Sequence, residues 1–418
     1  MRRYICWFGV MLLCLLTVNC GGGGGADSIP DGNGDDAADD GTSGDDQVDD
    51  DPWVGPAVTF ERMFGTAGED VAHAVLEVRG GGYLVAGTTD GTVDGNSDIY
   101  LARLDVDGTS LWSTTIGGAG DDSAYGIVAT NDDGFVIAGS TDSIGAGGLD
   151  VYLVKVDAAG KVLWSRTVGG VSDEAAHAID RTTDNGFIVA GYTKSSGAGR
   201  KDMYLIKTDA SGNELWSLTF GGTETDQAYS VEQTTDGGYL LAGEAWSFNA
   251  NGSYLVKTDI NGVEQWARAY GDSPGAAIQA SQTSDNGYIM VGMSGVIAPE
   301  MGDIFLTKTN ASGVVQWSRE FGGFAIEFGA GVVQVADHGF VVAGYTQSIG
   351  AGGQDVYLFK TDGNGEQDWA QTFGATGNDT AYAMRLTRDG GFVMVGQTDA
   401  SGTGDIYVVK TDADGILP

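Results

Sequence analysis

Acidic and basic side chains recur at regular intervals along this sequence, and paired carboxylates are groups that general acid–base catalysis uses. The bases follow one another every 50 to 52 residues, at Arg103, Lys155, Lys207, Lys257, Lys308, Lys360 and Lys410. A first set of acids lies at Asp70, Asp122, Glu174, Asp226, Glu327 and Asp379, and a second set at Asp98, Asp150, Asp202, Asp303, Asp355 and Asp405. A catalytic pair is used once in an active site, whereas these groups occur in almost every interval.

This recurrence indicates that the charges stabilise the fold. We predict one ion pair or capping acid in each interval, with Asp122 or Asp150 as the partner of Lys155. The exceptions fit this interpretation. Gly252 replaces one of the second acids, but Asp226 remains in that interval as a candidate partner for Lys257.

Histidine and cysteine, which often carry chemistry, form no constellation. His73 and His177 occupy a register that holds Tyr in other intervals, which indicates packing variants, and His338 falls in a predicted hairpin turn. The three cysteines lie within the first twenty residues, so nothing after Cys20 can form a disulfide, a thiolate metal site or a thiol nucleophile. With no zinc spacing, serine elbow or phosphate loop, we predict that the protein is not an enzyme.

Three short segments recur seven times from residue 60 onward and determine where these charges lie. The first begins with an aromatic residue, at 60–66, 112–118, 164–170, 216–222, 266–272, 317–323 and 369–375. The second is apolar and bounded by Gly, at 82–87, 134–139, 186–191, 238–243, 287–292, 339–344 and 391–396. The third covers 98–105, 150–157, 202–209, 252–259, 303–310, 355–362 and 405–412, and a fourth apolar stretch, such as 124–130, precedes the second. Four short strands in roughly 50 residues match the repeat period of β-propellers.

The composition of these strands and the ends of the chain indicate a closed ring. The strands are apolar on both faces, as a sheet packed between two neighbouring sheets requires. The last unit lacks its Trp strand, whereas residues 60–64 form an orphan strand of that type. We therefore predict an all-β fold, a seven-bladed β-propeller of four-stranded blades, in which residues 58–64 complete the last blade beside 405–412.

These residues resemble two groups of propellers. The Gly-Gly-aromatic segments and the Trp that follows a Gly turn resemble Kelch-type propellers. Units such as TTDGGYLLAG (234–243) are still more similar to the secreted prokaryotic seven-bladed propeller-repeat proteins, often lipoproteins. The resemblance covers about 60–418 and implies the fold, but no particular activity, because that family is defined by its repeats.

One segment resembles an enzyme motif. The run KVDAAGKVLW (155–164) is similar to the tryptophan motif of quinoprotein propellers, although Asp and Gly stand one residue closer here and a vicinal Cys pair is absent. A quinone-cofactor enzyme is therefore a minor alternative. A cofactor-free relative of that group, the outer-membrane-assembly scaffold lipoprotein, is the better alternative.

The N-terminus has the pattern of an export signal. Arg2 and Arg3 precede an apolar run of 15 residues, shorter than the ~20 that a membrane span needs. The run ends at LLTVNC (15–20) and GGGGG follows, which resembles a bacterial lipoprotein signal with lipid on Cys20. That family prefers Leu where this chain has Thr17, and Gly or Ala where it has Asn19. An ordinary secretory signal is therefore the alternative. In that family, Gly after the Cys implies the outer membrane.

Residues 21–56 contain eleven Asp and no Lys or Arg, a composition that cannot bury enough apolar surface to order itself. We predict three parts: a signal peptide (1–19), a lipidated Cys with a disordered Asp/Gly-rich tether (20–56) and the propeller (57–418).

The net charge of −37 excludes nucleic acid and anionic membrane surfaces as partners. We predict a monomer without a cofactor, with Ca²⁺ binding as the alternative interpretation of the acidity.

Departures from the repeat are the internal clue to a specific site, and they concentrate in the longer connections of blades 4 and 5. The candidate ligand patch consists of Glu244, Trp246, Phe248, Pro299, Glu300 and Met301. Aromatic side chains beside a carboxylate suit a sugar face or an extended peptide. We predict an envelope-anchored, non-catalytic propeller that recognises a protein or glycan partner. Neutral variation of the loops and a polysaccharide-acting enzyme, with Glu244 and Glu300 as its carboxylates, are the alternatives.

Overall fold

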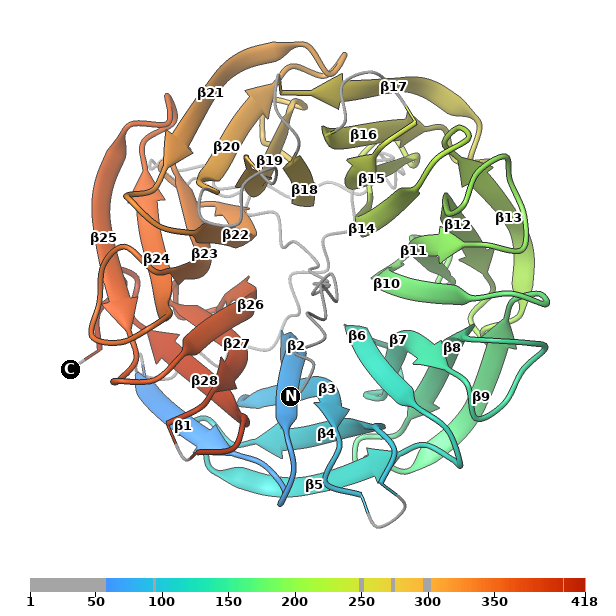
Figure 1. Ribbon diagram of the computed structural model, residues 1–418, viewed down its shortest axis with the longest axis horizontal. Coiled ribbons are helices and arrows are strands. Elements are labelled where there is room, and N and C mark those ends of the chain that lie inside the picture. The colour runs from blue at the N-terminus through green and yellow to red at the C-terminus, as the bar shows by residue number, and fades with distance from the viewer. Residues whose placement is uncertain are drawn as a thin grey trace, which may run out of the picture.

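The chain forms seven four-stranded antiparallel sheets arranged as blades around one axis (Figure 1). The computed structural model describes residues 58–92, 95–247, 252–271, 275–295, 302–400 and 402–417. The predicted all-β, seven-bladed β-propeller is therefore confirmed. Within the described residues no helix has the length and hydropathy of a membrane span.

Each blade contributes four strands, from the axis outward. The innermost strands are β2 (Asp70–Glu77), β6 (Asp122–Ala129), β10 (Glu174–Arg181), β14 (Asp226–Gln233), β18 (Gly275–Gln282), β22 (Glu327–Gln334) and β26 (Asp379–Leu386). The second strands are β3 (Tyr83–Thr89), β7 (Phe135–Thr141), β11 (Phe187–Thr193), β15 (Tyr239–Ala245), β19 (Tyr288–Ser294), β23 (Phe340–Thr346) and β27 (Phe392–Thr398). The third strands are β4 (Asp98–Leu104), β8 (Asp150–Val156), β12 (Asp202–Thr208), β16 (Gly252–Thr258), β20 (Ile304–Thr309), β24 (Asp355–Thr361) and β28 (Asp405–Thr411). The outer strands are β5 (Ser110–Ile116), β9 (Val162–Val168), β13 (Glu214–Phe220), β17 (Glu264–Tyr270), β21 (Val315–Phe321), β25 (Gln367–Phe373) and β1 (Phe60–Phe64).

The first strand of the described chain closes the ring. β1 pairs antiparallel with β28, from Phe60 opposite Lys410 to Phe64 opposite Ile406, and so supplies the outer strand of blade 7 (Figure 1). This is the predicted closure. It joins the two ends of the repeat region in one sheet, so that blade 7 has four strands like the others.

The aromatic residue at or near the start of each outer strand packs under a glycine turn of the following blade. A Cβ on Gly160, whose φ is +79°, would lie 2.7 Å from the Trp112 ring, and a Cβ on Gly212 would lie 2.6 Å from Trp164. Phe60 occupies the same place under Gly108. These contacts explain why Trp and the turn glycine recur together, and why Phe can replace Trp in the first copy.

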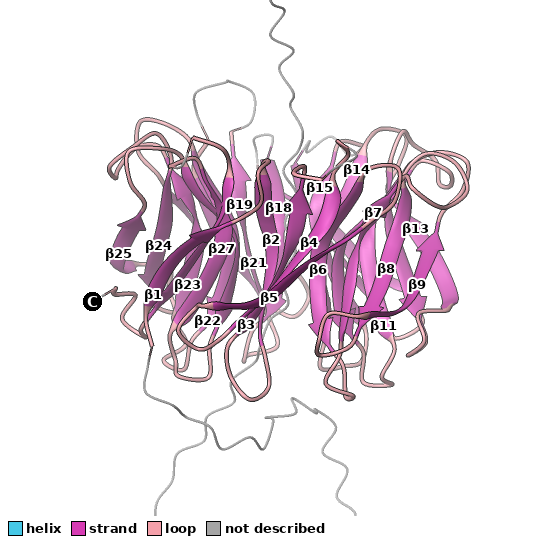
Figure 2. Ribbon diagram, turned by 90° about the horizontal axis from the view of Figure 1, so that it is seen from below, coloured by secondary structure: helices cyan, strands magenta, loops and turns pink. Residues whose placement is uncertain are grey.

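The connections lie on two faces of the ring (Figure 2). The shorter-turn face carries the connections between first and second strands and between third and outer strands. The longer-loop face carries the remaining connections. In the turn between the first and second strands, one position has positive φ in every blade, which favours Gly, Asn or Asp. His338, with φ 67°, holds this position in blade 6, as the hairpin prediction required.

Candidate functional site

The repeated bases form ion pairs, but with other acids than we predicted. Lys155 Nζ lies 2.6 Å from Asp132 Oδ1, and Lys257 Nζ lies 2.9 Å from Asp236 Oδ2. The same contact joins Lys207 to Asp184, Lys308 to Asp285, Lys360 to Asp337 and Lys410 to Asp389. The predicted partners Asp122, Asp150 and Asp226 begin strands at the longer-loop face, whereas each lysine side chain ends at the shorter-turn face.

The correct acid lies in the turn between the first and second strands. Antiparallel pairing places Lys155 opposite Val136, near the start of β7, and Asp132 lies in the turn just before that strand. Lys257 is 2% exposed, and it also donates to the carbonyl of Thr258 at 2.8 Å. Hydrogen bonds from Lys155 and Thr130 hold the pKa of Asp132 at about 2. These contacts lie in six of the seven blades, which makes them part of the framework.

The predicted first and second acids act as caps of backbone at the longer-loop face. Asp122 accepts from the amide of Gly118 at 2.8 Å and from Ser143 Oγ at 2.6 Å. Asp150 accepts from the amide of Ala146 at 2.8 Å, and burial raises its pKa. Asp226 accepts from the amide of Gly222 at 2.8 Å in the same way. The capping role that we predicted as one alternative thus describes these acids, and the ion pairing belongs to the turn acids.

The candidate ligand patch is described only in part. Trp246 follows β15 on the longer-loop face, and 40% of its surface is exposed. Glu244 lies within β15 and is buried. Phe248, Pro299, Glu300, Met301 and the lipidation candidate Cys20 lie outside the described residues. The pairing of Glu244 with Glu300 in an enzyme site therefore stays an untested hypothesis.

Glu244 belongs to a polar cluster beneath the longer-loop face, formed with Lys201, Gln227 and Tyr229. Glu244 Oε1 accepts from Gln227 Nε2 at 2.5 Å and from the hydroxyl of Tyr229 at 2.9 Å. Lys201 Nζ donates to Gln227 Oε1 at 3.1 Å. Burial and the Glu244 carboxylate raise the pKa of Tyr229 well above its usual value, and burial lowers that of Lys201. The Glu244 carboxylate thus already accepts hydrogen bonds from neighbouring side chains.

Aromatic rings from consecutive blades meet at the axis. Contacts between ring centroids run from Tyr382 through His73, Tyr125 and His177 to Tyr229, at separations of 5.1 to 6.1 Å. These five residues form the axial ring. Burial lowers the pKa of His73 to about 4 and that of His177 to about 3, so both are neutral near pH 7. They pack as the sequence analysis indicated.

Further exposed apolar side chains lie on the longer-loop face. Phe324, in the connection after β21, is fully exposed, and Ile349, in the connection after β23, is 52% exposed. The amide of Ala325, next to Phe324, donates to Ser348 Oγ at 3.0 Å, which brings these two loops of blade 6 together. Sequence analysis missed both residues. The signal was the aromatic Phe324 in a loop where the preceding blades carry Ala119, Val171 and Thr223.

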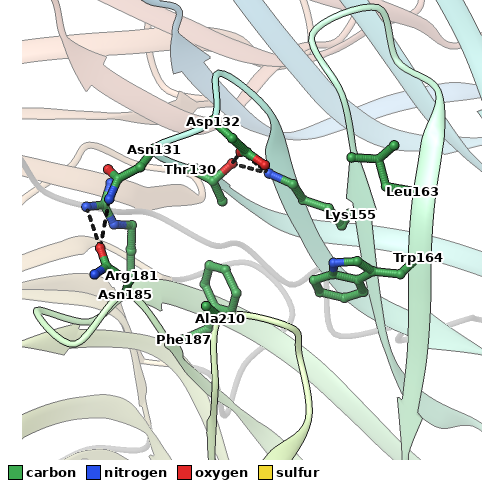
Figure 3. A pocket seen from close by; sticks show the side chains of 10 residues that line it. All are labelled: Thr130, Asn131, Asp132, Lys155, Leu163, Trp164, Arg181, Asn185, Phe187 and Ala210. Atoms are coloured by element: carbon green, nitrogen blue, oxygen red, sulfur yellow. Dashed lines mark hydrogen bonds and ion pairs between the residues drawn. The ribbon is translucent and has the colours of Figure 1, made fainter.

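A second candidate lies on the shorter-turn face, where blades 2 and 3 meet (Figure 3). We call it the seam pocket. It has a volume of about 310 Å³ and is lined by Thr130, Asn131, Asp132, Lys155, Leu163, Trp164, Arg181, Asn185, Phe187 and Ala210. Arg181 and Asn131 converge on Asn185 Oδ1, at 3.3 and 2.8 Å. Sequence analysis did not find this pocket, because its residues belong to registers that every blade fills.

No protein-family model matches the chain. Among curated proteins, the regulatory protein FlaEY of Caulobacter vibrioides is 25% identical over an alignment of 218 residues that covers 47% of this chain. The match spans 22% of that relative's length.

Solved structures of low sequence identity share the fold. The WD40 domain of Neurospora crassa Pan2 is 14% identical and superposes with a TM-score of 0.52, over 82% of this chain and 89% of that domain. Sqt1 of Chaetomium thermophilum is 13% identical, with a TM-score of 0.50 and 86% of each chain covered. YCF48 bound to D1 peptide is 11% identical, with a TM-score of 0.50, over 85% of this chain and 95% of that chain.

The described surfaces offer contact area and hydrogen-bond donors, and they lack a metal-ligand set. No group of three or more His, Cys, Asp or Glu suited to a metal ion is found among the residues that the structure describes. On the longer-loop face, Trp246 follows the strand that holds Glu244, whose polar cluster is already hydrogen-bonded internally, and Phe324 and Ile349 are exposed in loops of blade 6. Such an arrangement can bury a partner's apolar side chains, since the polar groups of the cluster are held in place.

Proposed function

We propose that this protein is an exported, lipid-anchored binding propeller that recognises a protein partner through the longer-loop face of blades 4 to 6, without catalysing a reaction. The observation that carries the proposal is the exposure of Trp246 and Phe324 on one face of a rigid ring. Large aromatic residues exposed in loops are the usual anchors of protein interfaces. Aliphatic Ile349 beside Phe324 favours a protein over a glycan, because sugars stack on aromatic rings and gain little from aliphatic chains.

The framework supports a binding role. Loops on a rigid scaffold can vary without loss of the fold, and propellers of low sequence similarity include YCF48, which was solved with a bound peptide. The lipid on Cys20 would hold the ring at the envelope, and the Asp-rich segment 21–56 would act as a spacer. The family resemblance to secreted propeller-repeat lipoproteins supports the same placement.

The binding face is tested by substitution of its aromatic residues. We expect Trp246→Ala with Phe324→Ala to weaken the affinity for an envelope partner, captured and identified with the wild-type chain, by at least about tenfold, since interface anchors contribute ~2 kcal/mol or more. Leu215→Ala is the matched control, because Leu215 is 58% exposed but lies on an outer strand. Equal affinity of wild type and double variant would contradict the proposal. Retention of glycans on an array, lost in the double variant, would instead make the partner a sugar.

The anchor is tested by Cys20→Ser. We expect labelled palmitate to enter the wild-type protein and to be absent from the variant, which should leave the membrane fraction, because one or more acyl chains supply the attachment. Membrane fractionation and autoradiography measure both effects. Unlabelled wild-type protein would show that the signal is an ordinary secretory one.

A further inference from the structure

Adjacent blades are joined on the shorter-turn face by a repeated hydrogen bond. The last residue of an innermost strand accepts from a backbone amide in the first turn of the preceding blade. The pairs are Thr183 with Gln233 at 2.8 Å, Thr235 with Gln282 at 2.8 Å, Ser284 with Gln334 at 2.8 Å and Arg388 with Glu77 at 2.9 Å. In each pair the acceptor is a side-chain oxygen, from an amide in three blades and from a carboxylate in blade 1.

The seam between blades 2 and 3 has no such acceptor. Arg181 holds the register of Gln233, as the last residue of β10, and a guanidinium can only donate. The equivalent donor is the backbone amide of Asn131. No hydrogen bond from that amide is found among the described residues, and Asn131 uses its side chain to reach Asn185 instead. The seam therefore lacks an oxygen that four of the other seams have.

The seam pocket lies at this position, and its polar groups are mainly donors. Arg181 donates to Asn185 Oδ1 at 3.3 Å, and among the described residues no carboxylate oxygen lies within salt-bridge distance of its guanidinium. Figure 3 shows the Trp164 indole below Lys155, with its ring nitrogen on the side of the pocket. Asp132, the acid that lines the pocket, is paired with Lys155. An oxygen anion would complete this set of donors.

Arg181 distinguishes this seam from the other seams that lack the acceptor oxygen. Two further seams lack the acceptor oxygen, but Ala129 and Leu386 hold the register there and bring no positive charge. Among the seven strand ends of this register, all of them described, only Arg181 puts a cation in place of the acceptor.

We propose that the seam pocket binds a carboxylate carried on a short apolar body. The carboxylate takes the place of the glutamine or glutamate oxygen of the other seams, accepting from Arg181 and from the amide of Asn131. Glu77 shows that a carboxylate fits this register, since it accepts from the amide of Arg388. The apolar body packs against Leu163, which is 52% exposed, and the edge of Trp164. A volume of about 310 Å³ suits a group of this size.

The C-terminal residue of a peptide and a free short-chain acid share this chemistry. Three probes distinguish them: fluorescein-labelled Gly-Ser-Gly-Ala-Leu with a free C-terminus, the same peptide as its C-terminal amide, and 4-methylpentanoate as a competitor. Fluorescence anisotropy with the full-length chain measures the affinities. We expect the free peptide to bind at least tenfold more tightly than the amide. If 4-methylpentanoate displaces the peptide with an affinity equal to that of the peptide, the natural ligand is a free acid. If the peptide binds tenfold more tightly than 4-methylpentanoate, the natural ligand is the C-terminal end of a peptide.

The repeat itself supplies variants that preserve the fold. Arg181→Gln introduces the residue that blades 4, 5 and 6 carry, and Leu163→Gln the residue found at Gln265 and Gln316. We expect Arg181→Gln to weaken binding of the free peptide at least tenfold and Leu163→Gln about threefold. Arg268→Gln, which removes a distant arginine on β17, should change binding less than twofold.

Three results would overturn the assignment. They are equal affinity for the free peptide and the amide, unchanged affinity in Arg181→Gln, and absence of binding of both acids to the wild-type chain at millimolar concentration. Thermal melting of each variant shows whether the ring is intact. Because these probes do not involve the longer-loop face, the outcome is independent of the proposed partner site.

Discussion

The two sides of the ring differ in how closely they follow the repeat. On the shorter-turn side, six blades pair a lysine with an aspartate of the neighbouring turn, with Lys257 and Asp236 as a representative pair. Around the axis and in the longer loops, several equivalent positions differ from blade to blade, although the acids that cap these loops recur in six blades. The register that holds Tyr229 in blade 4 holds His73 in blade 1.

The difference separates residues that hold the ring from residues that can give it specificity. A contact repeated in six blades cannot mark one site, since every blade would then bind the same ligand. A single departure from the repeat, such as Arg181 or Phe324, changes the surface at one place while the neighbouring blades keep the framework.

Loss of the ring closure is expected to have the largest effect. Deleting residues 57–66 removes β1 with the buried Phe60 and leaves β28 with an unpaired edge. We expect the melting temperature to fall by roughly 10 °C or more, because the cost of losing a buried Phe alone is ~3–5 kcal/mol. Calorimetry measures the change, and deletion of residues 21–56 serves as the control. Equal melting temperatures of the two deletions would show that β1 does not close the ring.

Loss of one repeated ion pair should have a smaller effect. Lys257→Ala leaves the carbonyl of Thr258 without its donor and empties a buried site, and we expect a loss of about 2–3 kcal/mol. The estimate is lower than for a fully buried pair, since the side chain of Asp236 is 53% exposed. Urea unfolding checks the value against Lys161→Ala, an exposed lysine, which should cost less than about 0.5 kcal/mol. If affinity for a partner fell without any loss of stability, Lys257 would belong to a binding site.

The smallest effect is expected at the axis and depends on pH. Burial lowers the pKa of His73 to about 4 from an ordinary value of 6.5. In this pH range the unfolded chain therefore binds a proton at His73 that the folded chain does not bind. The folded state has its full stability with respect to this group above pH 6.5 and loses it as the pH falls toward 4. His73→Tyr, which matches Tyr125 of blade 2, should reduce this acid destabilisation by up to about 3 kcal/mol at pH 4 and change little at pH 7.

Urea unfolding at pH 7, 5.5 and 4.5 measures this effect. His338→Asn is the control, because His338 is exposed in a turn where Asn185 and Asn286 hold the same position. Burial raises the pKa of Asp180 to about 6, which contributes with the opposite sign, so each variant is compared with wild type at the same pH. Parallel stability curves for His73→Tyr and wild type would show that His73 is not the group that titrates.

Much of the framework could be predicted from residue spacing. Strands that are apolar on both faces require neighbours on both faces, and an orphan Phe60 strand at one end matched a missing strand at the other. The structure confirms both inferences. The partner of Lys155 was predicted wrongly, because three acids of each repeat lie at comparable sequence distances and only their face of the ring separates them. Asp132 shares the face on which the lysine side chain ends, and Asp122 does not.

The candidate sites depended still more on tertiary structure. Trp246 could be singled out because it departs from the register of the other tryptophans, but its exposure required the fold. The seam pocket involves Asn131 and Arg181, 50 residues apart in sequence, and neither is unusual until the hydrogen bonds of the other seams are compared. By itself, the sequence determined the number of strands, their order and the closure of the ring, because these follow from periodicity and from the requirement that every apolar face be covered. Only the tertiary structure decided which charges pair and which donors lack an acceptor, because those contacts join different strands and different blades across space.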